Sequence, residues 1–541
     1  MGKPVASNEA DYVVVGGGSA GAAAASRLAQ SGASVILVEA GKKDTSVMVT
    51  KPGMIGPMHS VPQIKKNFDW GFYTTPQSHM LDRSVPQTRG KVLGGSSSVN
   101  GMLWVRGNRA NYDSWAAEGN TGWDADSVND VYRRVESFED GASDYRGGSG
   151  PIKVTRRPDK TEASEQFKQA TADTLGVKII ADYNAGEQEG VSTFQQSAHD
   201  GTRYSSSRGY ITDLAPDRLE VQTELQATRV VLEGSRAVGV EVLDKLGATR
   251  VIRAAKEVIV SAGVFGSPQL LMLSGIGPAA HLSEHGLDVV ADLPVGDNLH
   301  DHLFVPLTFS MDNAKHRGIP TYFARGVARE FTRGGSFLAH TVFETAAFVR
   351  TSQATDVPDL QIHVLPWAYP SPNQDAPVRH KVDRHPALTV MSTLIYPKSR
   401  GTLRLASADP TAAPLIDFKY LAEESDRRLL LEGAAMIREI MQAPVIKGSV
   451  KRELHPGTQY DAEALKSELL NRATTVYHGV GSCRMGVDER AVVGPDLKVR
   501  GIDGLRVADA SIMPSIIGGN TNAPSIMIGD KAAEIILSGG S

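Results

Sequence analysis

Asp11-Tyr-Val-Val-Val-Gly-Gly-Gly-Ser-Ala-Gly21 is the stretch that decides the fold. The three consecutive valines predict a short buried strand, because runs of β-branched apolar residues are typical of parallel sheets. The alanine-rich sequence that follows, 22–28, predicts a helix. A strand, a glycine turn and a helix in this order are typical of a dinucleotide-binding βαβ unit.

Each glycine of the turn has its own purpose in this interpretation. Gly16 allows the tight turn, Gly18 lets a pyrophosphate approach the backbone, and Gly21 lets the helix pack closely on the strand. The phosphates would lie at the helix N-terminus, where free N–H groups and the helix dipole favour negative charge. A second apolar run, 34–38, ends in Glu39, 18 residues after Gly21. An acid near this spacing binds a ribose hydroxyl.

The same turn also fits a second pattern. Gly17-Gly-Ser-Ala-Gly21 matches the nucleophile elbow of serine hydrolases, with Ser19 as the nucleophile. An elbow serine follows a later strand of a sheet that is already built, whereas a single strand precedes Ser19. A serine hydrolase is therefore a remote alternative to dinucleotide binding.

The length, charge and cysteine count of the chain limit the classes of protein to which it can belong. The 541 residues suggest about two to four domains. Lys and Arg number 57 and Asp and Glu 61, so the net charge of −4 gives no electrostatic case for nucleic acid. The one cysteine, Cys483, excludes an internal disulfide and indicates a reducing, cytoplasmic environment. Residues 1–10 do not read as a signal peptide, and no stretch approaches the roughly 20 apolar residues of a membrane span.

Strand and helix patterns that fit the dinucleotide-binding domain occur again in the middle and at the end of the chain. Three strands are predicted at 227–232, 237–243 and 249–260. A helix is predicted from Ser267, its N-cap, with Pro268 in the favoured first position. A final strand and a final helix are predicted at 505–508 and 523–537.

The sequences in between predict a second, inserted domain. Strand signals at 359–365, 388–396 and 400–405 indicate a mainly antiparallel sheet. The segment 44–80 is poor in helix signals, and a long irregular segment in a compact protein is usually a lid or a cofactor-covering loop. Further helices are predicted at 111–139, 161–175 and 423–442. The predicted class is α/β, α+β overall: a Rossmann-like domain with an inserted substrate domain built on an antiparallel sheet.

Five blocks of sequence follow one another along nearly the whole chain. They are Val13 to Gly21 with Glu39; Gly94-Gly-Ser-Ser-Ser-Val-Asn-Gly101; Gly263 to Gly277; Tyr477-His-Gly-Val-Gly-Ser-Cys-Arg-Met-Gly486; and Leu505 to Ser511 with Gly519-Asn-Thr-Asn-Ala-Pro524. Together, and in this order, the blocks resemble the glucose–methanol–choline (GMC) oxidoreductases. The set is far more specific than any one motif.

The resemblance implies FAD as the cofactor and oxidation of an alcohol, with hydride passing to flavin N5. It makes His478 the active-site base and Asn520 its partner, while Asn522 would be a structural turn residue. A neutral histidine can take the hydroxyl proton, because its pKa lies near working pH. An asparagine amide can donate a hydrogen bond to the same oxygen.

The resemblance also assigns residues to FAD. Asp509 and Ala510 match positions that meet the ribityl chain and the pyrophosphate, and Val230 matches the strand whose backbone reads the adenine. The range 89–100 matches the loop under the isoalloxazine. The full set is Gly16, Gly18, Ser19, Ala20, Gly21, Glu39, Ala40, Arg89, Val92, Gly94, Gly95, Asn100, Gly101, Met102, Val230, Tyr477, Asp509 and Ala510.

On this resemblance the chain divides into two domains and a covering segment. The covering segment is 45–84. The substrate domain is 156–219 with 306–494. The FAD-binding domain is discontinuous and comprises 9–44, 85–155, 220–305 and 495–541.

Departures from the family pattern refine the expected function. Val99 stands where some members carry a histidine linked covalently to FAD, so FAD is expected to be non-covalent. Phe304 stands where members that act on choline carry a glutamate, which favours a neutral, primary alcohol as substrate and an aldehyde as product. Val476 lies where some oxidases have a small apolar residue that admits oxygen. The electron acceptor, oxygen or a quinone-type compound, stays open.

Two further hypotheses remain beside alcohol oxidation. A flavin-binding member of the same fold without redox chemistry, such as a hydroxynitrile lyase, is the first alternative, and the remote one is the serine hydrolase with Ser19 as nucleophile. Separately, His300-Asp301-His302 resembles a metal pair. No third cluster with ligand spacing is evident, so we expect a loop-packing motif and no metal.

Overall fold

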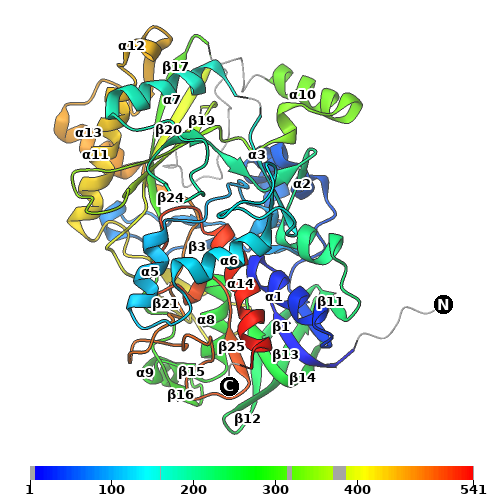
Figure 1. Ribbon diagram of the computed structural model, residues 1–541. Coiled ribbons are helices and arrows are strands. Elements are labelled where there is room, and N and C mark those ends of the chain that lie inside the picture. Colours follow the sequence, from blue (N-terminus) through cyan, green and yellow to red (C-terminus); the bar gives the residue numbers. More distant parts are fainter. Residues whose placement is uncertain (1–6, 159, 314–319, 369–385, 540–541) are drawn as a thin grey trace.

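A computed structural model describes residues 7–158, 160–313, 320–368 and 386–539. Two large sheets occupy the two halves of the molecule, and the chain passes between them several times (Figure 1). Helices and parallel strands make one half, and an antiparallel sheet with its own helices makes the other. The predicted α/β class, with a second antiparallel sheet, is confirmed.

The first sheet is built on the motif at the start of the chain. That motif is β1 (Glu9–Val15), α1 (Ser19–Gln30) and β2 (Val35–Glu39). β1 lies between β2 and β14 (Thr249–Val260) and is parallel to both. Because β1 has a strand on each side and helices over its faces, residues 13–15 are all apolar and at most 3% exposed.

The complete order of the first sheet is β11-β2-β1-β14-β13-β12, with β25 beside β14. β11 and β25 are parallel to their neighbours, whereas β12, β13 and β14 form an antiparallel meander. The added strands are β11 (Leu219–Thr223), β12 (Leu225–Glu233), β13 (Arg236–Asp244) and β25 (Leu505–Val507).

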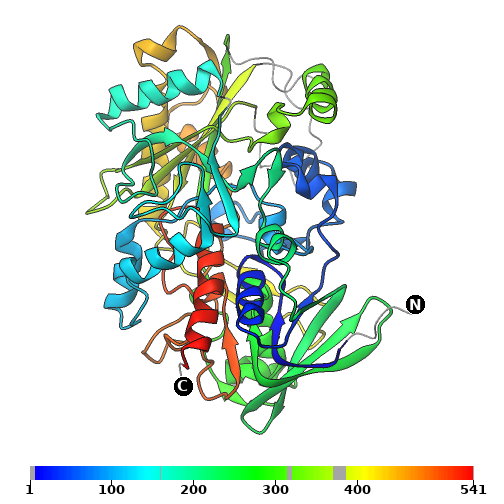
Figure 2. The ribbon, with the colours of Figure 1, turned by 45° about the vertical axis from the view of Figure 1, so that its right-hand side comes forward.

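Helix α14 (Asn522–Leu537) packs directly against α1 (Figure 2). The helices touch at small residues, because a Cβ added to Gly529 would lie 2.0 Å from the carbonyl oxygen of Ala20. The last helix of the described chain is therefore fixed to the first. Within the described ranges, no helix is long and apolar enough to cross a bilayer.

The second sheet is antiparallel throughout. Its order is β23-β17-β20-β19-β18-β7, and the short β24 lies beside β17. The strands predicted at 359–365 and 388–396 are confirmed as β19 and β20. The strands are β7 (Gly190–Thr193), β17 (Leu303–Met311), β18 (Thr345–Val349), β19 (Leu360–Leu365), β20 (Ala387–Leu394), β23 (Val450–His455) and β24 (Thr474–Thr475).

The two faces of the second sheet have different environments. On β20, Met391 lines a cavity, whereas the hydroxyl of Ser392 donates to the carbonyl of Leu430 on α11 (Glu424–Ile440) at 3.3 Å. Successive side chains of a strand point to opposite faces. A Cβ at Gly433 of α11 would lie 2.3 Å from Ser392 Oγ, so the helix approaches the sheet closely. Helix α11 thus covers one face and leaves the other to line the cavity.

Two predicted helices have different boundaries in the structure. The range 111–139 forms two helices, α5 (Arg109–Ala117) and α6 (Ala125–Val135), rather than one. Between them, Gly119 and Gly122 adopt φ angles of +96° and +81°, a left-handed conformation that ends a helix. The helix predicted at 161–175 is confirmed as α7 (Glu162–Leu175).

The helix predicted from Ser267 starts four residues earlier, as α8 (Gly263–Leu273). Pro268 therefore lies inside the helix, where its ring removes the N–H that would bond to the carbonyl of Val264. The Ser482 hydroxyl donates to that carbonyl at 2.6 Å instead. A residue from a distant loop thus satisfies the acceptor that the proline leaves free.

The remaining elements are short. The first part of the predicted covering segment contains four small helices, α2 (Val47–Thr50), η1 (Pro52–Met54), α3 (Ile55–Ser60) and α4 (Pro62–Lys65). Helix α10 (Pro320–Arg333) lies in the same half of the molecule as the second sheet (Figure 1). The others are β3 (Phe72–Tyr73), η2 (Ser78–Met80), β4 (Pro86–Gln87), η3 (Gly95–Ser98), β5 (Glu136–Phe138), β6 (Ile152–Arg156), β8 (Gln195–Gln196), β9 (Ala198–His199), β10 (Thr202–Arg203), η4 (Ser207–Asp213), β15 (Ile276–Gly277), α9 (Ala279–Glu284), β16 (Ala291–Asp292), η5 (Phe337–Ala339), β21 (Thr402–Arg404), β22 (Leu415–Asp417), α12 (Pro444–Lys447), α13 (Ala462–Asn471) and η6 (Ala510–Ile512).

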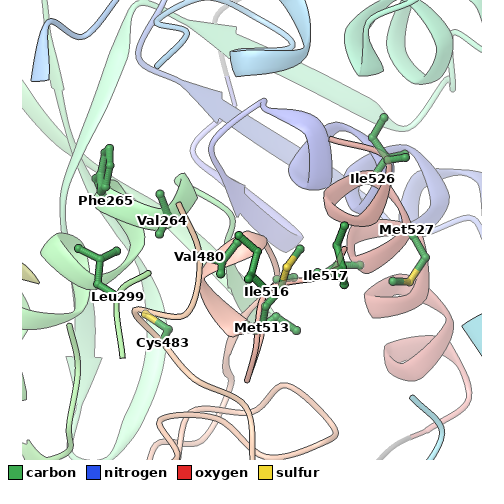
Figure 3. Close-up of a cluster of buried hydrophobic side chains, with 14 of the residues drawn as sticks. Val264, Phe265, Leu299, Val480, Cys483, Met513, Ile516, Ile517, Ile526 and Met527 are labelled. Carbon is green, nitrogen blue, oxygen red and sulfur yellow. The ribbon is translucent and has the colours of Figure 1, made fainter. Parts of the chain in front are cut away.

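One buried apolar cluster joins segments that are far apart in the chain (Figure 3). Its members come from α8, from the chain just before β17, from the chain around residue 480, from the chain before α14 and from α14 itself. They include Val264, Phe265, Leu299, Val480, Cys483, Met513, Ile516, Ile517, Ile526 and Met527. Because Val480 and Ile517 belong to it, this cluster anchors the loops that carry His478 and Asn520.

The close contact between α14 and α1 gives a stability test. We expect Gly529→Ala to lower the free energy of unfolding by about 1–3 kcal/mol, because the methyl group meets backbone rather than a mobile side chain. Thermal unfolding followed by circular dichroism measures the change. Gly448→Ala is the control, since its Cβ would have no atom within 4 Å. Equal melting temperatures for the two variants would contradict the packing described.

Candidate active site

A large cavity, of about 2590 Å³, extends from the glycine turn of the first sheet to the open face of the second. This exceeds the roughly 300–1,000 Å³ that holds one drug-sized ligand. Of the predicted site residues, Gly21, Val92, Gly94 and Val230 do not line it. Those that do are Gly16, Gly18, Ser19, Ala20, Glu39, Ala40, Arg89, Gly95, Asn100, Gly101, Met102, Tyr477, His478, Asp509, Ala510 and Asn520.

The glycines of the first turn are explained by the space around them. Gly16 has a φ of +98°, and a Cβ there would lie 2.4 Å from the carbonyl oxygen of Ser261. At Gly21 a Cβ would lie 1.9 Å from the carbonyl oxygen of Gly16. At Gly18 the nearest atom would be 3.9 Å away, on Gly95. The first two glycines are needed for packing, whereas Gly18 leaves its backbone open to the cavity.

The N-terminus of α1 faces this cavity through Ser19 and Ala20. Its N-cap, Gly18, has no side chain to accept the first N–H groups of the helix, and no side-chain cap is found there among the described residues. Free N–H groups and the helix dipole together form a site for an anion. These donors fit the pyrophosphate of a dinucleotide.

Glu39 lies at the end of β2 and accepts two backbone hydrogen bonds. Gly17 N–H donates to one carboxylate oxygen at 2.9 Å and Gly41 N–H to the other at 2.7 Å. Burial raises the pKa of Glu39 to about 7, against the opposing effect of these two bonds. The carboxylate lines the cavity beside the turn, where it can accept the hydroxyls of a ribose.

Backbone contacts fix the segment 89–102 beside the turn. Gly94 N–H donates to the carbonyl of Gly17 at 2.7 Å. From the other side, Arg203 Nη1 donates to the backbone carbonyl of Asn100 at 2.7 Å and to its side-chain oxygen at 2.8 Å. Gly94 is thus a support of the cavity wall rather than part of its surface.

Arg89 and Asp509 form hydrogen bonds that connect distant segments of the cavity wall. The Arg89 guanidinium donates to the carbonyl of Tyr477 at 2.8 Å, which connects its loop to the block that contains His478. Asp509 accepts the N–H of Gly263 at 2.9 Å and the hydroxyl of Ser267 at 2.5 Å. A carboxylate at the start of α8 is favoured by the helix dipole.

His478 and Asn520, the two predicted catalytic residues, meet on the cavity wall. Asn520 Nδ2 lies 3.1 Å from His478 Nε2. The other ring nitrogen of His478, Nδ1, lies 3.0 Å from Nδ1 of His302. Burial lowers the pKa of His478 well below its usual range, so the ring is neutral near pH 7. We call these two residues the His478–Asn520 pair.

Asn522 and Ser19 have a different partner, namely each other. The hydroxyl of Ser19 donates to Asn522 Oδ1 at 2.8 Å. The bond links the first turn of α1 to the first turn of α14. A hydrolase nucleophile needs a base that takes its proton, and an amide oxygen cannot do so. The serine-hydrolase alternative therefore finds no support.

His363 lines the cavity and was not predicted. It lies on β19, its ring is stacked on Phe194 with centroids 5.4 Å apart, and its Nδ1 is 3.1 Å from Thr393 Oγ1. Burial lowers the pKa of His363 to about 3, and a hydrogen bond with Asn520 acts in the opposite direction. The alternation of His363 with Leu365 on one predicted strand was the signal that could have identified it.

Val230, which the resemblance assigns to the adenine, lies on β12 behind the cavity wall. Its N–H donates to Ser274 Oγ at 2.8 Å, and the residue does not line the cavity. The cavity wall on β12 is formed earlier in the strand, by Leu225, Gln226 and Ala227. These three residues are therefore the part of β12 that a bound dinucleotide can reach.

Two models of one protein family, for its N-terminal and C-terminal parts, match this chain. The N-terminal model of the GMC oxidoreductase family matches residues 10–304 and the C-terminal model matches residues 397–529. This chain is a GMC oxidoreductase. Membership confirms the expected FAD cofactor and the expected class of enzyme, an FAD-dependent oxidoreductase that acts on CH–OH groups.

Relatives of this GMC oxidoreductase match it over nearly their whole length. An alcohol dehydrogenase (acceptor) from Pseudomonas putida is 38% identical over 538 residues, 97% of this chain and 95% of the relative. An oxygen-dependent choline dehydrogenase from Brucella suis is 37% identical over 540 residues, with 98% and 96% covered. Among solved structures, a pyridoxine 4-oxidase from Mesorbium loti has a TM-score of 0.86 at 28% identity, with 97% and 98% covered. A formate oxidase variant from Aspergillus oryzae has 0.90 at 27%, with 98% of each chain covered.

The donor set of the cavity fits FAD. The uncapped N-terminus of α1 suits the pyrophosphate, and Glu39 suits the ribose hydroxyls. The same cavity continues to the His478–Asn520 pair, so one dinucleotide can reach from the turn to the pair. Bound FAD would supply the hydride acceptor.

The pKa of Glu39 makes FAD affinity depend on pH. The ionised carboxylate accepts the ribose hydroxyls, so a proton must leave Glu39 when FAD binds below pH 7. We expect FAD affinity to rise as pH increases from about 5 to 7 and then to level off, by up to tenfold per pH unit. Fluorescence titration of the FAD-free protein measures this.

Glu39→Gln removes the titrating group. The variant should bind FAD about tenfold or more weakly at pH 8, and the pH dependence below 7 should be absent. Glu233→Gln on β12 is the control, because this exposed residue pairs with Arg253 on the outer part of the sheet. An unchanged pH dependence in Glu39→Gln would show that another group titrates.

Proposed function

We propose that this enzyme oxidises a neutral primary alcohol to the aldehyde, with His478 as the base. The observation that supports the proposal is the His478–Asn520 pair, with Nε2 and Nδ2 3.1 Å apart on the wall of the cavity. A base and a hydrogen-bond donor separated by 42 positions in the chain meet at one point. A hydroxyl oxygen placed there lies within reach of both.

The two residues have complementary roles in this proposal. An alcohol is a poor hydride donor until its O–H proton leaves, and neutral His478 takes that proton on Nε2. The Asn520 amide donates a hydrogen bond to the oxygen and so stabilises the negative charge that develops there. His363 lies on the other side of Asn520 and helps to hold its amide in this orientation.

The cavity next to the pair favours an uncharged substrate. Phe304, Leu365 and Met391 form a buried apolar cluster there. The partly buried side chains packed against it are Val342, Phe343, Trp367 and Val476. Among the described residues, the acids that line the cavity are Glu39, Asp69 and Asp509, and none belongs to this cluster. A cationic head group would therefore lose its hydration here without gaining a carboxylate partner.

We further propose that FAD is held without a covalent bond. Val99 is 4% exposed and lines the cavity beside Asn100, and an alkyl side chain has no atom that could form the bond. Acid denaturation should release the flavin. The electron acceptor in this proposal is oxygen or a quinone-type compound, and parallel assays of peroxide and dye reduction distinguish them.

The domain division proposed from the sequence agrees in outline with the two sheets. We propose that the first sheet and α14 belong to the FAD-binding domain, and that the second sheet and α11 belong to the substrate-binding domain. Residues 45–84 contribute Ile55, His59 and Val61 to the cavity wall, in keeping with a covering segment.

Anaerobic mixing with alcohols tests the proposed reaction. Primary alcohols should bleach the flavin absorption band of the loaded enzyme in a concentration-dependent way. A flavin that no alcohol reduces would favour the non-redox alternative, such as a hydroxynitrile lyase.

Removal of the base should slow the reduction of the flavin by alcohol and leave FAD binding unchanged. We expect His478→Gln to slow flavin reduction by an alcohol about 10²–10⁴-fold, the usual contribution of a general base. FAD content should stay at the parent level. His281→Gln is the matched control, since this histidine lies outside the cavity lining and accepts the N–H of Leu405 at 3.0 Å. A fast reduction in His478→Gln would exclude His478 as the base.

A pair of isosteric alcohols tests the preference for a neutral substrate. Choline and its uncharged analogue, in which carbon replaces the quaternary nitrogen, have the same shape and differ in charge. We expect the neutral alcohol to have the higher kcat/KM, by about tenfold or more, because the charge must be desolvated beside Phe304 without a partner. A preference for choline in steady-state assays would contradict the neutral-alcohol proposal.

A further inference from the structure

Three consecutive residues, His300, Asp301 and His302, form hydrogen bonds with the loops that carry the active-site residues. Asp301 accepts the backbone N–H of His478 at 2.7 Å. His300 Nε2 accepts the N–H of Ile516 at 3.0 Å, in the loop that leads to α14. Within the described ranges, no group of three or more His, Cys, Asp or Glu side chains could hold a metal ion. The contacts that the structure shows for the tripeptide are hydrogen bonds to the loops that carry His478 and Asn520.

The positions of the ring protons follow from the acceptors around His302. Its Nε2 lies 2.9 Å from the carbonyl oxygen of Ile395, which can only accept, so Nε2 carries a proton. Burial lowers the pKa of His302 to about 3, and the ring therefore holds one proton. His302 Nδ1 is then a lone pair. His478 Nδ1, 3.0 Å away, must carry the proton between them.

This arrangement decides which nitrogen of His478 is basic. With a proton on Nδ1, neutral His478 has its lone pair on Nε2, where Asn520 donates to it at 3.1 Å. The opposite tautomer would point an N–H at the Asn520 amide and leave two lone pairs facing each other at His302. The partner of one ring nitrogen thus sets the state of the other.

We infer that His302 is a positioning residue that fixes His478 in the tautomer whose Nε2 faces the substrate. The inference rests on the proposed role of His478 as the base. His302 lies behind the cavity wall, so it acts on the substrate only through its hydrogen bond with His478.

The proton balance of the step is simple. The alcohol proton moves to His478 Nε2, and the ring becomes an imidazolium whose Nδ1–H still donates to His302. His302 keeps its own proton on Nε2, because the Ile395 carbonyl cannot take it. The transferred proton therefore stays on His478.

Two isosteric variants of His302 separate hydrogen bonding from packing. Asparagine keeps an acceptor near the position of Nδ1, whereas leucine has the same branching and no acceptor. Both variants lose the bond to Ile395, so they differ in the acceptor for His478 alone. The measured quantities are the rate of anaerobic flavin reduction, the half-saturating alcohol concentration and the FAD content.

We expect His302→Leu to slow flavin reduction by about 100-fold or more, with the half-saturating concentration and FAD content unchanged. His302→Asn should stay within about tenfold of the parent, since it keeps one hydrogen bond. Equal rates in the two variants, whether both fast or both slow, would overturn the inference. Such rates would show that packing alone matters at this position.

A spectroscopic measurement tests the inference without turnover. In ¹⁵N NMR spectra of histidine-labelled, FAD-loaded enzyme, the His478 signal, identified by its absence in His478→Gln, should report a proton on Nδ1. A proton on Nε2 would overturn the inference even if the variants fail to fold. If the parent enzyme has the proton on Nδ1 but none of the alcohols reduces its flavin, the proposed function is refuted and the tautomer assignment still holds.

Discussion

One steric constraint underlies the structure: backbone must touch backbone where the first strand turns into the first helix. Gly94 N–H donates to the carbonyl of Gly17 at 2.7 Å, and no side chain fits at Gly16 beside Ser261. Segments far apart in the sequence are thereby brought to one turn. The cavity extends from this contact, and its wall there combines open backbone at Gly18 with the carboxylate of Glu39.

Local sequence predicted those parts of the fold whose causes are local. The run of valines at 13–15 by itself predicts β1, and α7 begins directly after its N-cap, Thr161. Prediction failed where a distant residue compensates for a local defect. Pro268 is tolerated inside α8 because Ser482 satisfies the carbonyl of Val264. No window of sequence around residue 268 contains that information.

The same division applies to the active site. His478 and Asn520 could be predicted because their surrounding sequence is distinctive, and the structure places them together. His302 and His363 contact His478 and Asn520, which lie on loops far away in the sequence, and such contacts are not visible in the periodicity of one segment. The tripeptide at 300–302 was noticed as a metal-like pattern. Its contacts show that three consecutive residues, two histidines and an aspartate, serve three separate parts of one site.

The partners of His478 come from both halves of the molecule. His302 directly precedes β17 of the second sheet, whereas Asn520 lies two residues before α14, which packs on α1 of the first. A hinge motion that separated the sheets would pull the base from one partner or the other and disarm it. Residues from 45–84 and Phe323 of α10 line the same cavity. The base keeps both of its partners only while the two sheets hold their relative positions.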